Sequence, residues 1–230
     1  MENKFFKELQ FDEKKISYLI GKVNPNLKNY IINNILDEYE LNDEGHNINH
    51  INSVLKRSFE LANDDIDVNI LYICATFHDI ACHIDRKKHE ILSAKRAYED
   101  KFLNEFFSED QMQTIKEAIE DHRASLEYVP RNINGKILSS ADRKVEVKSY
   151  LQSSLSYGFK NYPNLTKMEA ILRTYDLAIE KFGKNGYAVY KFYVDDKKYE
   201  QFLNDLQYLI DNKDEYIKLA EIVYKEIKGE

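Results

Sequence analysis

The sequence predicts an all-α fold, and two observations support this prediction. Its 230 residues include three prolines and seven glycines, whereas sandwiches and barrels need turn residues at regular short intervals. Leu, Ile, Lys and Glu are abundant, and this composition favours long helices. Because 43% of the residues are hydrophobic, the chain can bury a full core, and we expect one helical domain over residues 1–230.

The helices of the N-terminal and central parts follow from apolar residues at helical spacing. An amphipathic opening runs to about Leu41, and the polar residues 42–45 interrupt it. In the next helix, His50 lies beside the apolar stripe. Ser108 and Gln111 have the spacing of a capping box, which predicts a helix start. Helices are expected from about 46 to 62, from about 65 to the pair at 78–79 and from 108 to about 122, with further helical faces after His89 and after the loop at 129–135. A loop is expected near Phe107.

The C-terminal part, about residues 151–230, contains no histidine and is expected to form a helical extension. Thr166 and Glu169 again have the spacing of a capping box, and the helix that they begin should end near Gly183. Residues 187–194 are compatible with a short strand or a helical turn. The tail that follows predicts one or two amphipathic helices.

Two adjacent polar residues, His78 and Asp79, end the apolar run 68–77, where a buried core is expected. Burying a carboxylate and an imidazole costs several kcal/mol unless a cation or hydrogen-bond partners compensate. Together these groups suit Mn, Fe, Co, Ni or Zn, and a mixed set with open positions suits catalysis better than a closed structural site. The candidate ligands are His50, His78, Asp79, His89, His122 and Asp142, of which His50, His122 and Asp142 lie in or beside apolar helical rows.

Composition and the lack of targeting signals narrow the possible functions. The net charge of −7 and an isoelectric point near 5.5 argue against broad nucleic-acid binding, which needs a basic surface. We find no signal peptide and no apolar stretch of about 20 residues, so we expect no membrane span and a reducing, cytoplasmic setting. Cys74 and Cys82 lie eight residues apart, too far along the axis to form a disulfide if one continuous helix carries both.

The order of the candidate ligands resembles that of the HD-domain superfamily of metal-dependent phosphohydrolases. Residues 45–54 resemble the first-histidine helix of this family, and residues 76–80 resemble its defining His-Asp doublet. Residues 89–94 and 139–143 resemble its later histidine and terminal aspartate segments. The resemblance implies an HD-domain helical bundle at about residues 44–150, with additional N- and C-terminal helices.

By this resemblance, a first metal ion would be held by His50, His78, Asp79 and Asp142. His89 and His122 would join Asp79 at a second ion in two-metal members, or would contact the substrate phosphate in one-metal members. The cofactor is therefore expected to be one or two divalent ions of Mn, Fe, Co, Ni, Zn or Mg. The doublet is followed by residues 80–82, Ile-Ala-Cys, rather than Ile-Gly-Lys. No Gly-Tyr-Pro signature follows it either, and this disfavours cyclic-dinucleotide hydrolysis.

The function that we expect is hydrolysis of a phosphomonoester or phosphoanhydride, with a nucleotide or a related small molecule as substrate. Two ions can generate a hydroxide near neutral pH and stabilise the leaving oxygen. Asp79 would bridge the ions, and Asp121 would act as a general base or orient His122. Phosphate recognition needs cations, for which the candidates are Arg123, Arg143, Lys87 and Lys88.

Two other functions remain open at this stage: a di-iron oxygenase of the HD type, and a non-catalytic regulatory module that is stabilised by metal. Three residues near the pattern have other expected roles. His46 lies one helical turn before His50 and could be a ligand on the same face, but a role in capping the helix or supporting a ligand is preferred. His83 would lie in a loop or at the rim. Cys82 would be a small buried residue or would face the site. The oligomeric state does not follow from the sequence.

Overall fold

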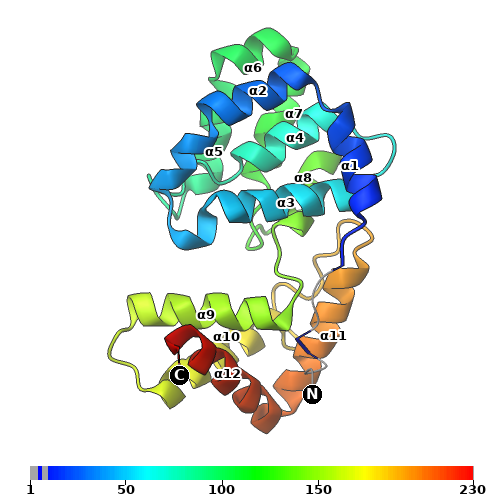
Figure 1. The fold of residues 1–230 in the computed structure, drawn as a ribbon. Coiled ribbons are helices and arrows are strands. Elements are labelled where there is room, and N and C mark those ends of the chain that lie inside the picture. Colours follow the sequence, from blue (N-terminus) through cyan, green and yellow to red (C-terminus); the bar gives the residue numbers. More distant parts are fainter. Residues whose placement is uncertain (1–4, 7–9, 230) are drawn as a thin grey trace. The chain divides into compact units, whose positions relative to one another are not determined.

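The computed structural model describes residues 5–6 and 10–229, and every regular element in this part of the chain is a helix (Figure 1). The all-α prediction is therefore confirmed. The predicted domain also included residues 1–4, 7–9 and 230, which lie outside the described residues. None of the described helices is long and apolar enough to cross a membrane.

The chain divides into two compact units. One holds residues 11–143 and 193–195, and the other holds the described residues of 1–10, 144–192 and 196–230. The division after Arg143 comes shortly before the limit of about 150 that was expected between the metal-binding core and the C-terminal extension.

The unit that contains residues 11–143 is built from α-helices and two short 3-10 helices, η1 and η2. In chain order they are α1 (Glu13–Lys22), α2 (Pro25–Asn34), η1 (Leu36–Leu41), η2 (Glu44–His46), α3 (Ile48–Leu61), α4 (Val68–Phe77), α5 (His89–Tyr98), α6 (Lys101–Phe106), α7 (Glu109–Glu120) and α8 (Ile133–Ala141).

Helix α4 forms the centre of this unit and packs against α3, α5, α7 and α8 (Figure 1). Every residue of α4 from Ile70 to Phe77 is buried, as expected of a helix that is apolar on all sides. The chain therefore leaves α4 inside the protein. The next two residues, His78 and Asp79, are 0% and 2% exposed.

Side-chain caps determine where several helices of this unit begin. Asn47 accepts hydrogen bonds from the backbone N–H groups of Asn49 and His50, so α3 begins at Ile48 rather than at about residue 46. The predicted capping box at Ser108 and Gln111 is present at the start of α7. These caps place His50 in the first turn of its helix.

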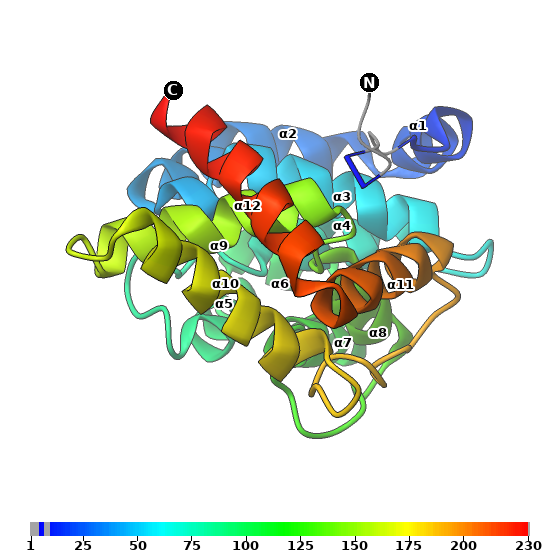
Figure 2. The ribbon, with the colours of Figure 1, turned by 90° about the horizontal axis from the view of Figure 1, so that it is seen from below.

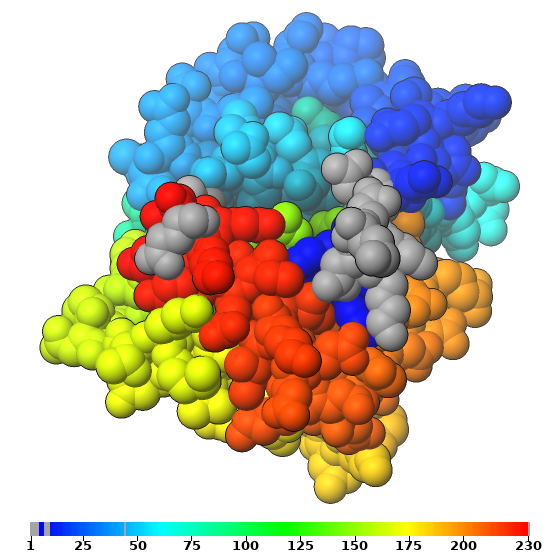
Figure 3. Space-filling model, turned by 60° about the horizontal axis from the view of Figure 1, so that its bottom comes forward, coloured from blue at the N-terminus to red at the C-terminus, as the bar shows by residue number. Residues whose placement is uncertain are grey.

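The second unit contains α9 (Val147–Asn161), α10 (Lys167–Phe182), α11 (Lys197–Asp211) and α12 (Lys213–Lys228). Figure 2 views these four helices from below, and Figure 3 shows the surface that α11 and α12 present in orange and red. The predicted capping box at Thr166 and Glu169 begins α10, which ends before Gly183 as expected. Residues 187–190 form a turn, and residues 187–194 contain no strand.

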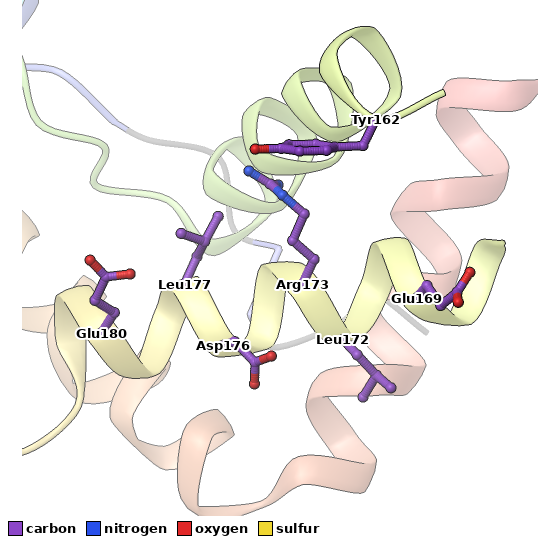
Figure 4. Close-up of a pocket in the computed structure, with 7 residues that line it drawn as sticks. All are labelled: Tyr162, Glu169, Leu172, Arg173, Asp176, Leu177 and Glu180. Atoms are coloured by element: carbon purple, nitrogen blue, oxygen red, sulfur yellow. The ribbon is translucent and has the colours of Figure 1, made fainter. Parts of the chain in front are cut away.

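A surface groove of about 460 Å³ lies along α10 in this unit (Figure 4). Among its described lining residues the cation is Arg173, whose guanidinium lies 5.2 and 4.9 Å from the ring centroids of Tyr157 and Tyr162. Its carboxylates are Glu169, Asp176 and Glu180. Glu169 already serves the capping box of α10.

Candidate metal centre

Four side chains at the ends of three helices form a first cluster. His50 lies in the first turn of α3, His78 and Asp79 follow the last residue of α4, and Asp142 follows α8. His50 Nε2 lies 3.2 Å from Asp79 Oδ2 and 3.2 Å from Asp142 Oδ1. His78 Nε2 lies 3.3 Å from His50 Nε2 and 3.3 Å from Asp79 Oδ2. We call these four residues cluster 1.

A second cluster shares Asp79 with the first. His89 begins α5 and His122 follows the end of α7, and these two helices pack against each other. Their Nε2 atoms lie 3.2 Å apart. The Nε2 atoms of His89 and His122 lie 3.2 and 3.5 Å from Asp79 Oδ1. We call Asp79, His89 and His122 cluster 2. One oxygen of Asp79 thus faces each cluster.

Three of the cluster histidines have the same tautomer. Each places Nδ1 against the backbone carbonyl of the third residue before it, at 2.9 Å for His78, 2.9 Å for His89 and 2.6 Å for His122. Because a carbonyl oxygen only accepts, Nδ1 carries the proton in each ring, and Nε2 of the neutral ring carries a lone pair. All three lone-pair nitrogens therefore face the carboxylate of Asp79.

This arrangement fits a bound cation. Asp79 Oδ1 is buried and has no hydrogen-bond partner, and when the rings of His89 and His122 are neutral, the nitrogens that lie beside it have no proton to donate. Lone pairs that face a buried carboxylate repel it unless a cation lies between them. Ligand bonds of about 2.1 Å separate neighbouring ligand atoms by about 3.0 to 3.4 Å, close to the distances in both clusters. His78, His89 and His122 also have the backbone hydrogen bond that orients many metal-ligating histidines.

The charges within cluster 1 shift several pKa values. Burial lowers the pKa of His50, but its contacts with Asp142 and Asp79 raise this pKa to about 9. Burial raises the pKa of Asp79, but the surrounding histidines, His78 first, hold it well below its usual range. The pKa of Asp142 is also lowered, because its contact with His50 outweighs burial. Without metal, protonated His50 thus supplies positive charge between the two carboxylates.

Asn42 connects η1 to the turn that carries Asp79. Its Nδ2 atom donates to the backbone oxygens of Asp79, at 2.9 Å, and of His46, at 3.1 Å. Its Oδ1 atom accepts from the backbone N–H of His83 at 2.8 Å. From the sequence, Asn42 is only part of the polar break at residues 42–45. A single Asn between helices carries no signal for such a long-range contact.

Three residues that were not expected among the six ligands lie close to the turn that carries Asp79, namely His46, His83 and Cys82. His46 ends η2, and its Nδ1 atom lies 2.6 Å from Asp43 Oδ1. His83 lies in the exposed loop after Asp79, as expected for a rim residue. Cys82 is buried, and burial together with the charge of Asp79 raises the pKa of its thiol.

The predicted phosphate-binding cations lie on two segments. Lys87 and Lys88 are exposed in the loop before His89. Arg123 follows His122 and donates to the backbone oxygen of Lys87 at 2.8 Å and to Glu90 at 3.1 Å. These three cations therefore lie on the segments that carry cluster 2.

The fourth predicted cation, Arg143, follows Asp142 of cluster 1. Its guanidinium lies over the ring of Tyr193, 5.1 Å from the centroid. Tyr193 carries no signal in the sequence for this contact. It belongs to residues 193–195, where the chain returns to this unit after α10. Only this return of the chain brings Tyr193 beside Arg143.

Asp121 lies next to His122 in the sequence, but its carboxylate binds another segment. It accepts a hydrogen bond from the Tyr128 hydroxyl at 2.9 Å and from the Arg131 backbone N–H at 2.8 Å. The Arg131 guanidinium donates to both of its oxygens. The structure therefore makes Asp121 an anchor for the loop after α7. His122 is oriented by a backbone carbonyl and not by Asp121, and neither cluster contains Asp121.

The comparisons with known proteins agree with this geometry. The family model described as HD domain matches residues 47–145, a segment that contains all six residues of clusters 1 and 2. No curated protein matches the chain, and no solved structure matches it.

Proposed function

The chain contains an HD domain at residues 47–145, and from this premise we propose that the protein is a metal-dependent phosphohydrolase. Its substrate would be a phosphomonoester or phosphoanhydride of a nucleotide or a related small molecule. HD domains are generally metal-dependent hydrolases, and both clusters offer the imidazole and carboxylate ligands that divalent ions bind.

The observation that supports the proposal most strongly is the position of Asp79. Its Oδ2 atom lies within 3.3 Å of His50 and His78, and its Oδ1 atom lies within 3.5 Å of His89 and His122. A carboxylate that has two imidazole nitrogens beside each of its oxygens suits two bound ions rather than one. When bound, two ions would lower the pKa of a water molecule and polarise a phosphoryl oxygen.

The residues of the chain itself would bind and orient the substrate. Arg123 would contact the phosphate from the side of cluster 2, and Arg143 from the side of cluster 1. Arg123 is held by Glu90 and by the backbone of Lys87, so little side-chain freedom would be lost on binding. The exposed amino groups of Lys87 and Lys88 would attract an anionic substrate to this loop.

The experiment that tests the proposal has two parts. Elemental analysis of protein purified without chelator should show stoichiometric metal. Release of inorganic phosphate should then be measured over a panel of phosphomonoesters and nucleotides. Asp79→Ala should abolish both metal binding and turnover, whereas His83→Ala, which changes an exposed histidine outside both clusters, should abolish neither.

The same experiment separates the alternatives. Oxygen consumption by the iron-loaded protein without phosphate release would replace the proposal with an HD-type di-iron oxygenase, whose ligands are also imidazole and carboxylate. Stoichiometric metal with neither activity would instead favour a metal-stabilised regulatory module.

A further inference from the structure

A third group of metal-type ligands lies beside the two clusters. One ring nitrogen of His46, one oxygen of Asp79 and the sulfur of Cys82 all lie within 4.8 Å of one another. His46 comes from η2, whereas Asp79 and Cys82 come from the turn after α4. His46 and Cys82 belong to neither cluster, and His46 precedes the segment that the HD-domain model matches.

The ligand chemistry of this group differs from that of clusters 1 and 2. Both clusters consist of imidazole and carboxylate alone, whereas this group adds a thiol sulfur. A thiolate is a soft ligand and selects ions such as Zn²⁺ over Mn²⁺ and Mg²⁺, which prefer oxygen. Cys82 is free, because neither cysteine forms a disulfide.

A separate observation also indicates a ligand role for His46. Its Nδ1 atom lies 2.6 Å from Asp43 Oδ1. Asp43 in turn accepts from the backbone N–H of Gly45 at 3.0 Å and from Arg86 at 2.7 Å. A carboxylate that accepts from one ring nitrogen leaves the other with a lone pair and fixes the ring, as is common for metal-ligating histidines.

We propose that His46, Asp79 and Cys82 form a third cation-binding position, which takes a thiophilic divalent ion such as Zn²⁺. Three protein ligands leave one position of a tetrahedral ion open. An ion bound there would be held by the thiolate of Cys82, and the thiol proton would be released to solvent. Because Asp79 also faces clusters 1 and 2, an ion in the third position would bind the same carboxylate that the two clusters share.

The test uses Co²⁺ as a probe and does not require turnover. A cysteine thiolate bound to Co²⁺ gives an intense near-ultraviolet charge-transfer band, which Co²⁺ bound to histidine and carboxylate alone does not give. We expect this band in the full-length wild-type protein and in Cys74→Ala, which changes the other buried cysteine. Cys82→Ser should lack the band.

Two further variants test the ligand and its support. His46→Ala should raise the Co²⁺ concentration for half-maximal absorbance at least tenfold, and Asp43→Asn should raise it about ten- to a hundredfold. Circular dichroism checks that each variant is folded. If Cys82→Ser does not fold, the His46 and Asp43 variants decide the test.

Three results would overturn the proposal. The wild-type protein could fail to show the thiolate band at saturating Co²⁺. The band could persist in folded Cys82→Ser, or disappear in Cys74→Ala instead. The third result is an unchanged half-maximal concentration in both His46→Ala and Asp43→Asn. None of these depends on phosphate release, so the failure of this proposal is distinguishable from failure of the proposed hydrolase function.

Discussion

The number of ions at Asp79 can be read from the stability that each ion adds. An ion that binds only the folded protein stabilises it by about 2.7 kcal/mol when its free concentration is 100 times its dissociation constant. If both clusters bind, the wild-type protein gains about 5.4 kcal/mol. At about 4 °C per kcal/mol for a unit of this size, each ion raises Tm by about 11 °C.

Three variants separate the contributions of clusters 1 and 2 to the metal-dependent rise in Tm. His89→Ala removes a ligand of cluster 2 only, so about half of the metal-dependent rise in Tm should remain. Asp79→Ala removes the residue that both clusters share, and the rise should disappear. His83→Ala changes an exposed histidine outside both clusters and should keep the full rise.

The assay is calorimetric or fluorimetric thermal unfolding of each variant, with chelator and with saturating Mn²⁺ or the ion found by elemental analysis. Comparing the two conditions within one variant removes the intrinsic effect of the substitution on stability. The two-ion reasoning is refuted if His89→Ala keeps the whole rise, because one ion at cluster 1 would then account for it.

Three further predictions concern pH, the Asp121 anchor and phosphate recognition. In metal-free protein the pKa of His50 is raised to about 9, which contributes up to about 3 kcal/mol to the free energy of unfolding. This contribution is complete below about pH 6.5 and is lost as the pH rises through about 9. Urea unfolding with chelator would contradict the prediction if the free energy of unfolding did not change between pH 7 and 10. Arg131→Ala leaves the buried Asp121 carboxylate without its cation and should lower the free energy of unfolding by about 3 kcal/mol. A loss below about 1 kcal/mol in urea unfolding would argue against Asp121 as an anchor of the loop after α7. Arg123→Ala should raise KM about tenfold or more and change kcat less, since it removes a charge-assisted contact to phosphate; an unchanged KM in steady-state kinetics would exclude this contact.

The positions of several helix ends followed from local sequence alone. The capping boxes at Ser108 and Thr166 predicted the starts of α7 and α10, because a cap depends on residues three positions apart. The segment between His89 and the loop expected near Phe107 is divided into α5 and α6. Asp100 caps α6 through the backbone N–H of Leu103 and is also bound by Arg96 and Tyr30. Its contact with Tyr30 is not visible in the local sequence.

Asp121 shows why adjacency in the sequence is a weak guide to a site. Consecutive residues at a helix end point in different directions, so His122 faces Asp79 while Asp121 faces the loop after α7. The partner of Asp121, Arg131, lies ten residues later. The distance between two side chains depends on this loop, whose path the helical pattern does not predict.

From the sequence by itself, helical spacing predicted the helical fold, and the resemblance to the HD-domain family pointed to the six residues of clusters 1 and 2. Only the tertiary structure decided how these residues face one another. The packing of α3, α4, α5, α7 and α8 brings together ends that are distant in the chain. That packing directs one oxygen of Asp79 to each cluster and places His46 beside Cys82. Periodicity determines which face of a helix is buried, whereas contacts between the buried faces determine which atoms meet.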